Sequence, residues 1–189
     1  MHVSNVNMPW MLSVSTLKKP YHHGDLRAAL LDAADALLEQ GGDGAVSLRE
    51  AARMAGVSPT AAYRHFADKD DLLAALAVRG FAAFGAALGA ARAEPGVSAF
   101  GARGRAYVRF ALERPGRFRL MFGPLLARSA AHPALQAASR QAFAALEAAA
   151  QGHEAALRGW SMAHGLAHLL LDGAIRTEDR QALIDTLLR

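Results

Sequence analysis

One stretch of the sequence, residues 47–72, constrains the fold more than any other, because it carries the start signals of two short helices with a glycine between them. Ser47 and the glutamate three residues later have the spacing of a capping box, in which each side chain accepts from an otherwise unpaired backbone N–H. Gly56 permits a left-handed backbone, and Ser58 followed by Pro59 starts a second helix. Two short helices joined by a tight turn predict a helix-turn-helix, whose second helix enters the DNA major groove.

The predicted second helix offers hydrogen-bond donors without nearby negative charge. No acidic residue occurs between Glu50 and Asp68, so nothing in that interval repels phosphate. Ala61 is small enough to let the helix approach DNA, and Lys69 begins the next helix, where it can reach the flanking backbone. The donors to phosphate oxygens or base edges are Ser58, Thr60, Tyr63, Arg64 and His65. The alternative is a surface-exposed helical hairpin in another all-α protein.

Residues 21–72 resemble the DNA-binding domain of the TetR family of one-component transcriptional regulators. The resemblance lies in a long first helix, SLREAA at the start of the second, GVS at the turn, and YRHF-x-x-K-x-x-L beyond it. It implies that Tyr63, His65 and Lys69 hold phosphates and that Ser47 and Arg49 touch the DNA backbone. The residues that it implies for the groove are Ser58, Pro59, Thr60, Ala61 and Arg64. Ala62 departs from the family pattern, which often has a larger aliphatic residue there, so the packing beneath the helix should differ.

Charge and composition add limits rather than an identity. The net charge is +4, yet residues 18–71 hold seven basic and nine acidic residues, so the predicted reading head is net −2. The residue pattern therefore favours DNA binding and the bulk charge does not. The chain has no cysteine, which excludes disulfides, thiolate zinc sites and thiol catalysis.

The N-terminal residues 1–17 lack a basic start followed by an apolar core, so we expect a disordered tail and not a secretory signal. The alternative is an overlong start, with Met8 or Met11 as the initiator. Lys18 and Lys19 can form a short arm on phosphates or in the minor groove, and a solvated basic tail is the alternative. We expect no apolar run long enough to span a bilayer, since the nearest, residues 72–91, is interrupted by Arg79 and consists mostly of small residues. A cytoplasmic protein without membrane contact is the expectation.

The apolar pattern divides the chain into a DNA-binding domain at residues 18–75 and a helical effector-binding and dimerisation domain at 76–189. A first helix ending at Gly41-Gly42 should pack its apolar face under the helix-turn-helix. Its outer face should carry Arg27, Asp32, Asp35 and Glu39. A fourth helix, capped by Asp68 and reaching about residue 91, should join the two domains and link ligand to DNA mechanically.

The rest of the chain predicts five more helices, over residues 97–112, 115–122, 133–151, 153–172 and 178–188, with prolines or glycines at the junctions. This gives an all-α fold of about nine helices, as in TetR proteins. ERPGRFRLMF at 113–122 and GWSMAHGLAHLLLDG at 159–173 resemble a TetR subgroup with a Trp-x-x-x-His-Gly signature. Here the signature residues are Trp160, His164 and Gly165.

The helix over residues 153–172 is apolar nearly all round, so it needs a second partner besides its own core. We expect that partner to be the same helix of a second subunit, the alternative being full enclosure by one chain. The predicted interface residues are Leu157, Leu171, Leu183, Ile184 and Leu187. A twofold dimer would space two recognition helices about one DNA turn apart.

Aromatic and thioether residues predict a pocket for an apolar small-molecule effector, with plain core as the alternative. They are Phe84, Tyr107, Phe110, Phe118, Met121, Phe122, Phe143, Trp160 and His164. Eleven arginines in the same region would suit an anionic effector or simply form a solvated surface, which we favour. They are Arg79, Arg92, Arg103, Arg105, Arg109, Arg114, Arg117, Arg119, Arg128, Arg140 and Arg158.

Other chemistry has little support in the sequence. His164 and His168 have a metal-binding spacing, but a zinc site needs more ligands, so we expect no metal and no cofactor. Ser161 lies in a motif close to a nucleophile elbow, yet within a helical pattern, so we expect no enzyme. The resemblance implies a dimeric transcriptional regulator, a repressor more often than an activator, that binds a palindromic double-stranded operator and is released by a small-molecule effector. The alternative is a helical protein-binding adaptor without specific DNA recognition.

Overall fold

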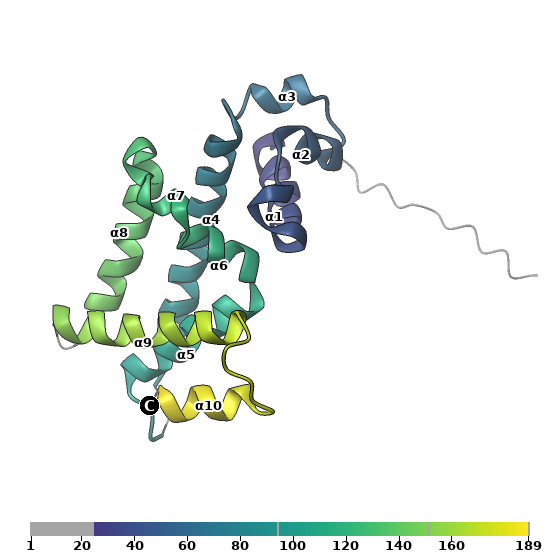
Figure 1. Ribbon diagram of the computed structural model, residues 1–189. Helices are drawn as coiled ribbons and strands as arrows, with labels where there is room; N and C mark the ends of the chain where they lie inside the picture. Colours follow the sequence, from purple (N-terminus) through teal and green to yellow (C-terminus); the bar gives the residue numbers. More distant parts are fainter. Residues whose placement is uncertain (1–24, 94, 151, 189) are drawn as a thin grey trace, which may run out of the picture.

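The computed structural model describes residues 25–93, 95–150 and 152–188, and its elements are helices (Figure 1). The expectations for residues 1–17, Lys18 and Lys19 lie outside this described part of the chain. The helices of the N-terminal part are α1 (Leu26–Ala45), α2 (Leu48–Ala55), α3 (Pro59–Tyr63) and α4 (Lys69–Ala90). The remainder comprises α5 (Ala99–Glu113), α6 (Pro115–Met121), α7 (Pro124–Ala127), the 3₁₀ turn η1 (Ser129–Ala131), α8 (Pro133–Glu147), α9 (His153–Leu171) and α10 (Arg180–Leu187).

Helices α2 and α3 form where their start and stop signals predict. The Ser47 hydroxyl accepts from the Glu50 N–H at 3.1 Å, and the Ser58 hydroxyl accepts from the Ala61 N–H at 3.3 Å. Gly56 ends α2 with φ 72°, and the next residue, Val57, donates its N–H to the Ala52 carbonyl at 3.0 Å. This is a Schellman ending, which turns the chain directly into α3 and fixes the angle between the two helices.

The small core beneath the helix-turn-helix comes from one face of α1 and the first turns of α4. Leu30, Leu38, Phe66, Leu72 and Leu76 are all fully or almost fully buried there. Burial of one such side chain contributes about 1.5–3 kcal/mol. Helix α1 loses regular helical geometry at Gly41 and Gly42, where its predicted end lies. Figure 1 shows α3 at the tip of this head, farthest from the rest of the molecule.

Helix α4 runs without a break from the head into the body (Figure 1). Its start is doubly capped, because Asp68 accepts from the Asp71 N–H at 2.8 Å and Asp71 accepts from the Ala67 N–H at 3.0 Å. Its first half buries leucines in the head, and its second half buries Phe81 and Phe84 in the body. One continuous helix thus carries any displacement of the body to the segment that follows α3.

Within the described residues α4 is also the one helix long and apolar enough to cross a membrane, with a mean hydropathy of 1.8 over its best window. The expectation that no run reaches this length was therefore wrong. Half of that window is buried in the fold, where α4 packs against α1, α5, α6 and α8. Arg79 on its exposed side pairs with Asp32 of α1. These are the surroundings of a core helix.

The body packs α8 against α4 and α9 against α5, with α10 beside α5 at the end of the chain (Figure 1). An aromatic cluster fills its centre: the Phe84 ring meets Tyr107 edge-on at 4.9 Å and Phe110 at 5.3 Å between ring centroids. The five helices predicted for this half are present, each within a few residues of its predicted bounds. Helix α7 and η1 lie in the interval 123–132, where no helix was predicted.

Candidate functional site

Helix α3 and the two residues after it expose polar side chains at the tip of the head. Their donors are not engaged with the protein: among the described residues, Thr60, Tyr63, Arg64 and His65 make no side-chain hydrogen bond or ion pair. Tyr63 is 51% exposed although it is aromatic. Ala62 is fully buried and lies directly against the core, so the methyl group at this position lets α3 sit close to the helices beneath it. The remaining predicted groove residues, Ser58, Pro59 and Ala61, lie on the same segment, the first two exposed and Ala61 half-buried.

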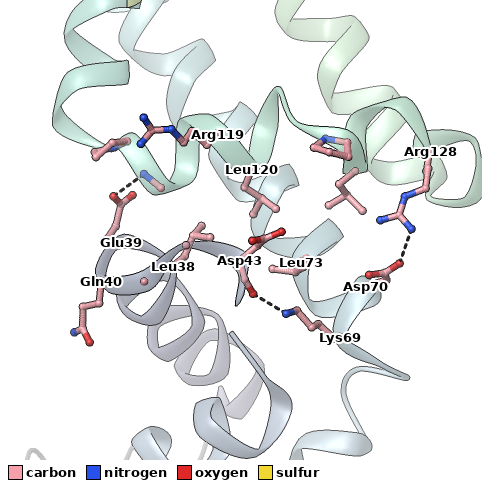
Figure 2. Close-up of a pocket in the computed structure, with 16 residues that line it drawn as sticks. Leu38, Glu39, Gln40, Asp43, Lys69, Asp70, Leu73, Arg119, Leu120 and Arg128 are labelled. Atoms are coloured by element: carbon pink, nitrogen blue, oxygen red, sulfur yellow. Dashed lines mark hydrogen bonds and ion pairs between the residues drawn. The ribbon is translucent and has the colours of Figure 1, made fainter. Parts of the chain in front are cut away.

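The flanking residues predicted to touch the DNA backbone have mixed surroundings. Arg49 is exposed on α2, whereas Ser47 is half-buried and its hydroxyl caps that helix. The Lys69 side chain is held by the protein, because its Nζ donates to the carbonyl oxygen of Asp43, near the end of α1, at 2.6 Å (Figure 2). An ammonium group has three donors, so this bond leaves two for another partner.

A cavity of about 700 Å³ lies between α4, α8 and α9 and is closed on one side by α7 and η1. Four of the predicted pocket residues line it, namely Phe84, Phe122, Phe143 and Trp160. The other five predicted pocket residues do not line it and pack in or against the aromatic cluster: Tyr107, Phe110, Phe118, Met121 and His164. The residues that complete its lining are Phe81, Leu126, Ser129, Gln136, Ser139, Arg140, Ala142, Leu146, Glu147, His153 and Leu157.

Of the α8 residues that line this cavity, sequence reasoning identified Phe143 and missed the others. Gln136, Arg140, Phe143 and Glu147 recur at helical spacing and line it from one face of α8. The sequence shows this spacing. It does not identify a cavity wall, because a helix face that mixes charged and apolar residues is typical of an ordinary helix surface. Only the position of α9 opposite α8 makes it a cavity wall.

Three side chains beside the cavity form a hydrogen-bonded chain. The Trp160 Nε1–H donates to the Tyr107 hydroxyl at 3.1 Å, and that hydroxyl lies 2.8 Å from His164 Nδ1. An indole is a donor only, so the Tyr107 oxygen accepts from Trp160, and the tautomer of His164 decides which group donates in the second bond. Burial lowers the pKa of His164, and the adjacent His168 lowers it further. Burial also raises the pKa of Tyr107 above its usual range.

The pair His164 and His168 has ring centroids 4.6 Å apart. In the part of the chain that the structure describes, no group of three or more His, Cys, Asp or Glu residues is arranged to hold a metal ion.

A second cavity, of about 550 Å³, lies where the head meets the body, and Figure 2 shows polar contacts around it. Glu39 of α1 accepts from the backbone N–H groups of Gly116 and Arg117 at the start of α6, both at 3.0 Å. Arg117 Nε donates to Asp35 Oδ1 at 3.0 Å, and its Nη2 contacts Oδ2 of the same carboxylate. Gly116 allows this approach, because a Cβ there would lie 2.5 Å from the Leu38 carbonyl oxygen.

These contacts correct two expectations. Asp35 and Glu39 do not lie on an outer, solvated face of α1, since both are half-buried against α6. Arg117 is not part of a solvated arginine surface, because it is only 9% exposed. The physical reason is that α6 packs on α1, which no local sequence pattern reveals.

The residues predicted for a dimer interface differ in how much surface they present. Leu157 and Leu187 are exposed, Leu171 and Leu183 are half-buried, and Ile184 is only 4% exposed within this chain. Helix α9 exposes two further large apolar side chains, Met162 at 48% and Leu169 at 45%. Gly165 lies between them in the sequence, and a Cβ added there would meet no atom within 4 Å.

Comparison with known proteins decides the family. Residues 30–76 match the family described as bacterial regulatory proteins, tetR family, and residues 100–189 match the tetracyclin repressor-like C-terminal domain. A solved structure of a protein of unknown function from Rhodococcus sp. RHA1 is 32% identical, with a TM-score of 0.71 over 90% of this chain and 93% of that one. The chain belongs to the TetR family.

Two more distant structures share the TetR fold. A TetR transcriptional regulator from Rhodococcus sp. RHA1 is 22% identical, with a TM-score of 0.60, and the match covers 86% of this chain and 92% of that one. The multidrug binding protein EbrR complexed with ethidium is 22% identical, with a TM-score of 0.63 over 88% and 98%. No curated protein matches the sequence.

Membership of the TetR family makes this chain a transcriptional regulator with a helix-turn-helix, and not an enzyme. The predicted family and the all-α fold class are confirmed. The subgroup with the Trp-x-x-x-His-Gly signature stays a prediction. In this TetR chain the signature Trp160 and His164 are the two ends of the hydrogen-bonded chain through Tyr107.

Proposed function

We propose that the protein is a repressor that binds a palindromic operator as a homodimer and is released by a small-molecule effector. The observation that carries this proposal is the surface of α3, where exposed donors have no partner among the described residues and no acidic side chain intervenes. Such a surface on a capped, rigid scaffold is suited to the phosphates and base edges of a duplex.

The assignment of DNA contacts follows from this surface. Tyr63, His65 and Lys69 hold phosphates, with Ser47 and Arg49 at the flank. Contacts of Lys18 and Lys19 with DNA stay a prediction from the sequence, because both lie outside the described residues. Lys69 uses the two donors that its bond to Asp43 leaves free. The groove is read by the α3 segment, namely Ser58, Pro59, Thr60, Ala61 and Arg64.

The dimer is proposed to form through α9 and α10. The exposed Met162 and Leu169, together with Leu157 and Leu187, give an apolar surface that a single chain leaves in water. Gly165 has open space above it, so a second helix can approach α9 closely. A twofold arrangement of this surface would present two copies of α3 to one duplex.

The effector is proposed to occupy the 700 Å³ cavity, which is lined by five aromatic side chains, Phe81, Phe84, Phe122, Phe143 and Trp160. The existence of EbrR complexes with ethidium and imidazole on a related fold supports a ligand site of this kind. Because α4 lines the cavity and continues into the head, a ligand that binds one tilt of α4 more tightly would change the spacing of the two α3 helices. We place the boundary between the two domains, residues 18–75 and 76–189, inside α4. We also propose that the protein is cytoplasmic.

A gel-shift assay with DNA from beside the protein's own gene, over a series of salt concentrations, tests the function. Binding to one palindrome that weakens steeply with salt is expected. If the protein binds every DNA equally weakly and instead retains another protein, it is a helical adaptor and the proposal fails.

A further inference from the structure

The structure sorts the eleven arginines of residues 79–158 by their partners. Six of them form ion pairs with carboxylates: Arg79, Arg105, Arg117, Arg119, Arg128 and Arg158. Arg92 and Arg103 donate to backbone carbonyl oxygens of their own helices or the adjoining turn. The side chains of the other three, Arg109, Arg114 and Arg140, have no hydrogen-bond or ion-pair partner among the residues that the structure describes.

Of those three arginines, Arg140 alone lines the 700 Å³ cavity. Its neighbours on α8 that also line the cavity are Gln136, one helical turn earlier, Ser139, the preceding residue, and Phe143, three residues later. The Ser139 hydroxyl donates to the Gln136 carbonyl oxygen at 3.1 Å, whereas the Gln136 side-chain amide makes no hydrogen bond within the described chain. This end of the cavity therefore offers a guanidinium and an amide to a ligand.

The carboxylate at the opposite end of the same wall already has a partner within the chain. Glu147 lies two helical turns beyond Arg140, about 10 Å along the axis. Its carboxylate contacts the Nδ1 of His153, which also lines the cavity. Between the two ends the wall is apolar, formed by Phe143 and Leu146 of α8 and faced by Trp160 of α9. Among the described lining residues, Arg140 is therefore the charged side chain that has no hydrogen-bond or ion-pair partner.

We propose that the effector is an amphipathic carboxylate whose head binds Arg140 and whose apolar body lies among Phe84, Phe143 and Trp160. A planar guanidinium binds a carboxylate through two parallel N–H···O bonds, which fixes the head and orients the body along α8. The apolar walls gain by covering the rest of the molecule. This inference rests on the proposed effector function, because it names the ligand class for the same cavity.

Trp160 provides a direct readout, since its indole lines the cavity. The only other tryptophan in the sequence is Trp10, so W10F gives a protein with a single reporter. We would titrate this W10F protein with three probes of equal chain length, decanoate, decan-1-ol and decyltrimethylammonium, and follow Trp160 fluorescence. Decanoate is expected to bind about tenfold more tightly than the alcohol.

The decisive comparison uses two arginine substitutions in the W10F background. R140M should bring the affinity for decanoate down to that for the alcohol and leave the alcohol unchanged. R140K should restore part of the loss. R109M removes another arginine without a partner, which lines a different cavity beside α5, and should change neither affinity. Tighter binding of the quaternary ammonium probe, absence of binding by decanoate, or equal effects of R140M and R109M would overturn the proposal.

A gel shift in the presence of decanoate separates this proposal from the proposed function. Decanoate that binds through Arg140 but leaves operator binding unchanged would uphold the assignment of the ligand class and count against effector release. If the protein binds no DNA but still binds decanoate through Arg140, the proposed function is contradicted and the proposed ligand class is not.

Discussion

The guanidinium of Arg117 on α6 and the carboxylate of Asp35 on α1 form a two-bond ion pair that is nearly closed to water, with 10% and 15% of the two side chains exposed. The two residues are 82 positions apart in the sequence. Together with Glu39 they tie the helix that supports the DNA-binding head to a helix of the body. Because α6 also carries Phe118 and Met121 into the aromatic core, the pair connects that core to the head.

Replacing Arg117 with methionine should lower the free energy of unfolding by about 3 kcal/mol, because Asp35, whose side chain is only 15% exposed, would lose its counter-ion. Urea denaturation followed by circular dichroism measures the change. R158M breaks an exposed pair on α9 and should change stability by less than about 0.5 kcal/mol. The double variant D35L/R117M should recover part of the loss. An equal effect of R117M and R158M would contradict the role given to the buried pair.

Replacing Tyr63 with phenylalanine should weaken binding to every DNA sequence by about tenfold, because the lost hydroxyl is proposed to donate to a phosphate. Fluorescence anisotropy at one fixed salt concentration, with operator and random duplexes, measures this. Tyr63 is half-exposed and has no side-chain partner in the described chain, so the fold should not change. Q141A, at an exposed position on α8, serves as the control.

Arg64 should behave differently from Tyr63 if its guanidinium reaches a base edge. R64A is expected to lower affinity for the operator and also to reduce discrimination at one base pair by about 1–3 kcal/mol. A panel of operators with single substitutions at each position, measured for parent and variant, locates that base pair. A uniform loss across the panel would instead assign Arg64 to a phosphate.

The α9 surface can be tested through oligomeric state. The double variant M162K/L169K should remain folded, since both side chains are exposed. Light scattering should give the variant the mass of a 20.0 kDa monomer and the parent the mass of a dimer. Loss of operator binding should follow. E113K, at an exposed position on α5, changes the net charge by the same two units and should leave the dimer intact. A monomeric parent would refute the interface altogether.

The lowered pKa of His164 makes stability depend on pH in a defined direction. An unfolded chain has the ordinary histidine pKa of 6.5, so as the pH falls it binds the proton before the folded protein does. Stability should therefore decrease as the pH drops through 6.5. Urea midpoints at pH 7.5 and pH 5.5 should differ more in the parent than in H164Q, whose amide oxygen can accept from Tyr107. H168Q, which removes the neighbouring charge, should retain most of the dependence.

The head could be predicted from sequence because its signals are local. Ser47, Gly56, Ser58 and Asp68 each act within four residues, so the helix ends follow from spacing alone. The helices of the body were predictable from prolines, glycines and apolar repeats for the same reason.

The cavity and the tie between domains could not be predicted in this way. Periodicity identified Tyr107 and Phe118 as apolar-facing, but it does not distinguish a residue in the core from one at a cavity wall. Asp35 and Glu39 have the spacing of a solvated helix face, and their partners lie 77 or more residues away. Pairing of this kind depends on tertiary packing, which local sequence does not encode.

The start of α6 has no capping side chain of its own and receives its acceptor from Glu39. This contact needs a glutamate at the position of Glu39 on α1. It also needs a glycine at the position of Gly116, because a Cβ there would lie 2.5 Å from the Leu38 carbonyl oxygen. Heads and bodies exchanged between relatives would therefore need to match at these two positions. A chimera that ignores them is expected to leave the first turn of α6 frayed, even if each half retains its own core.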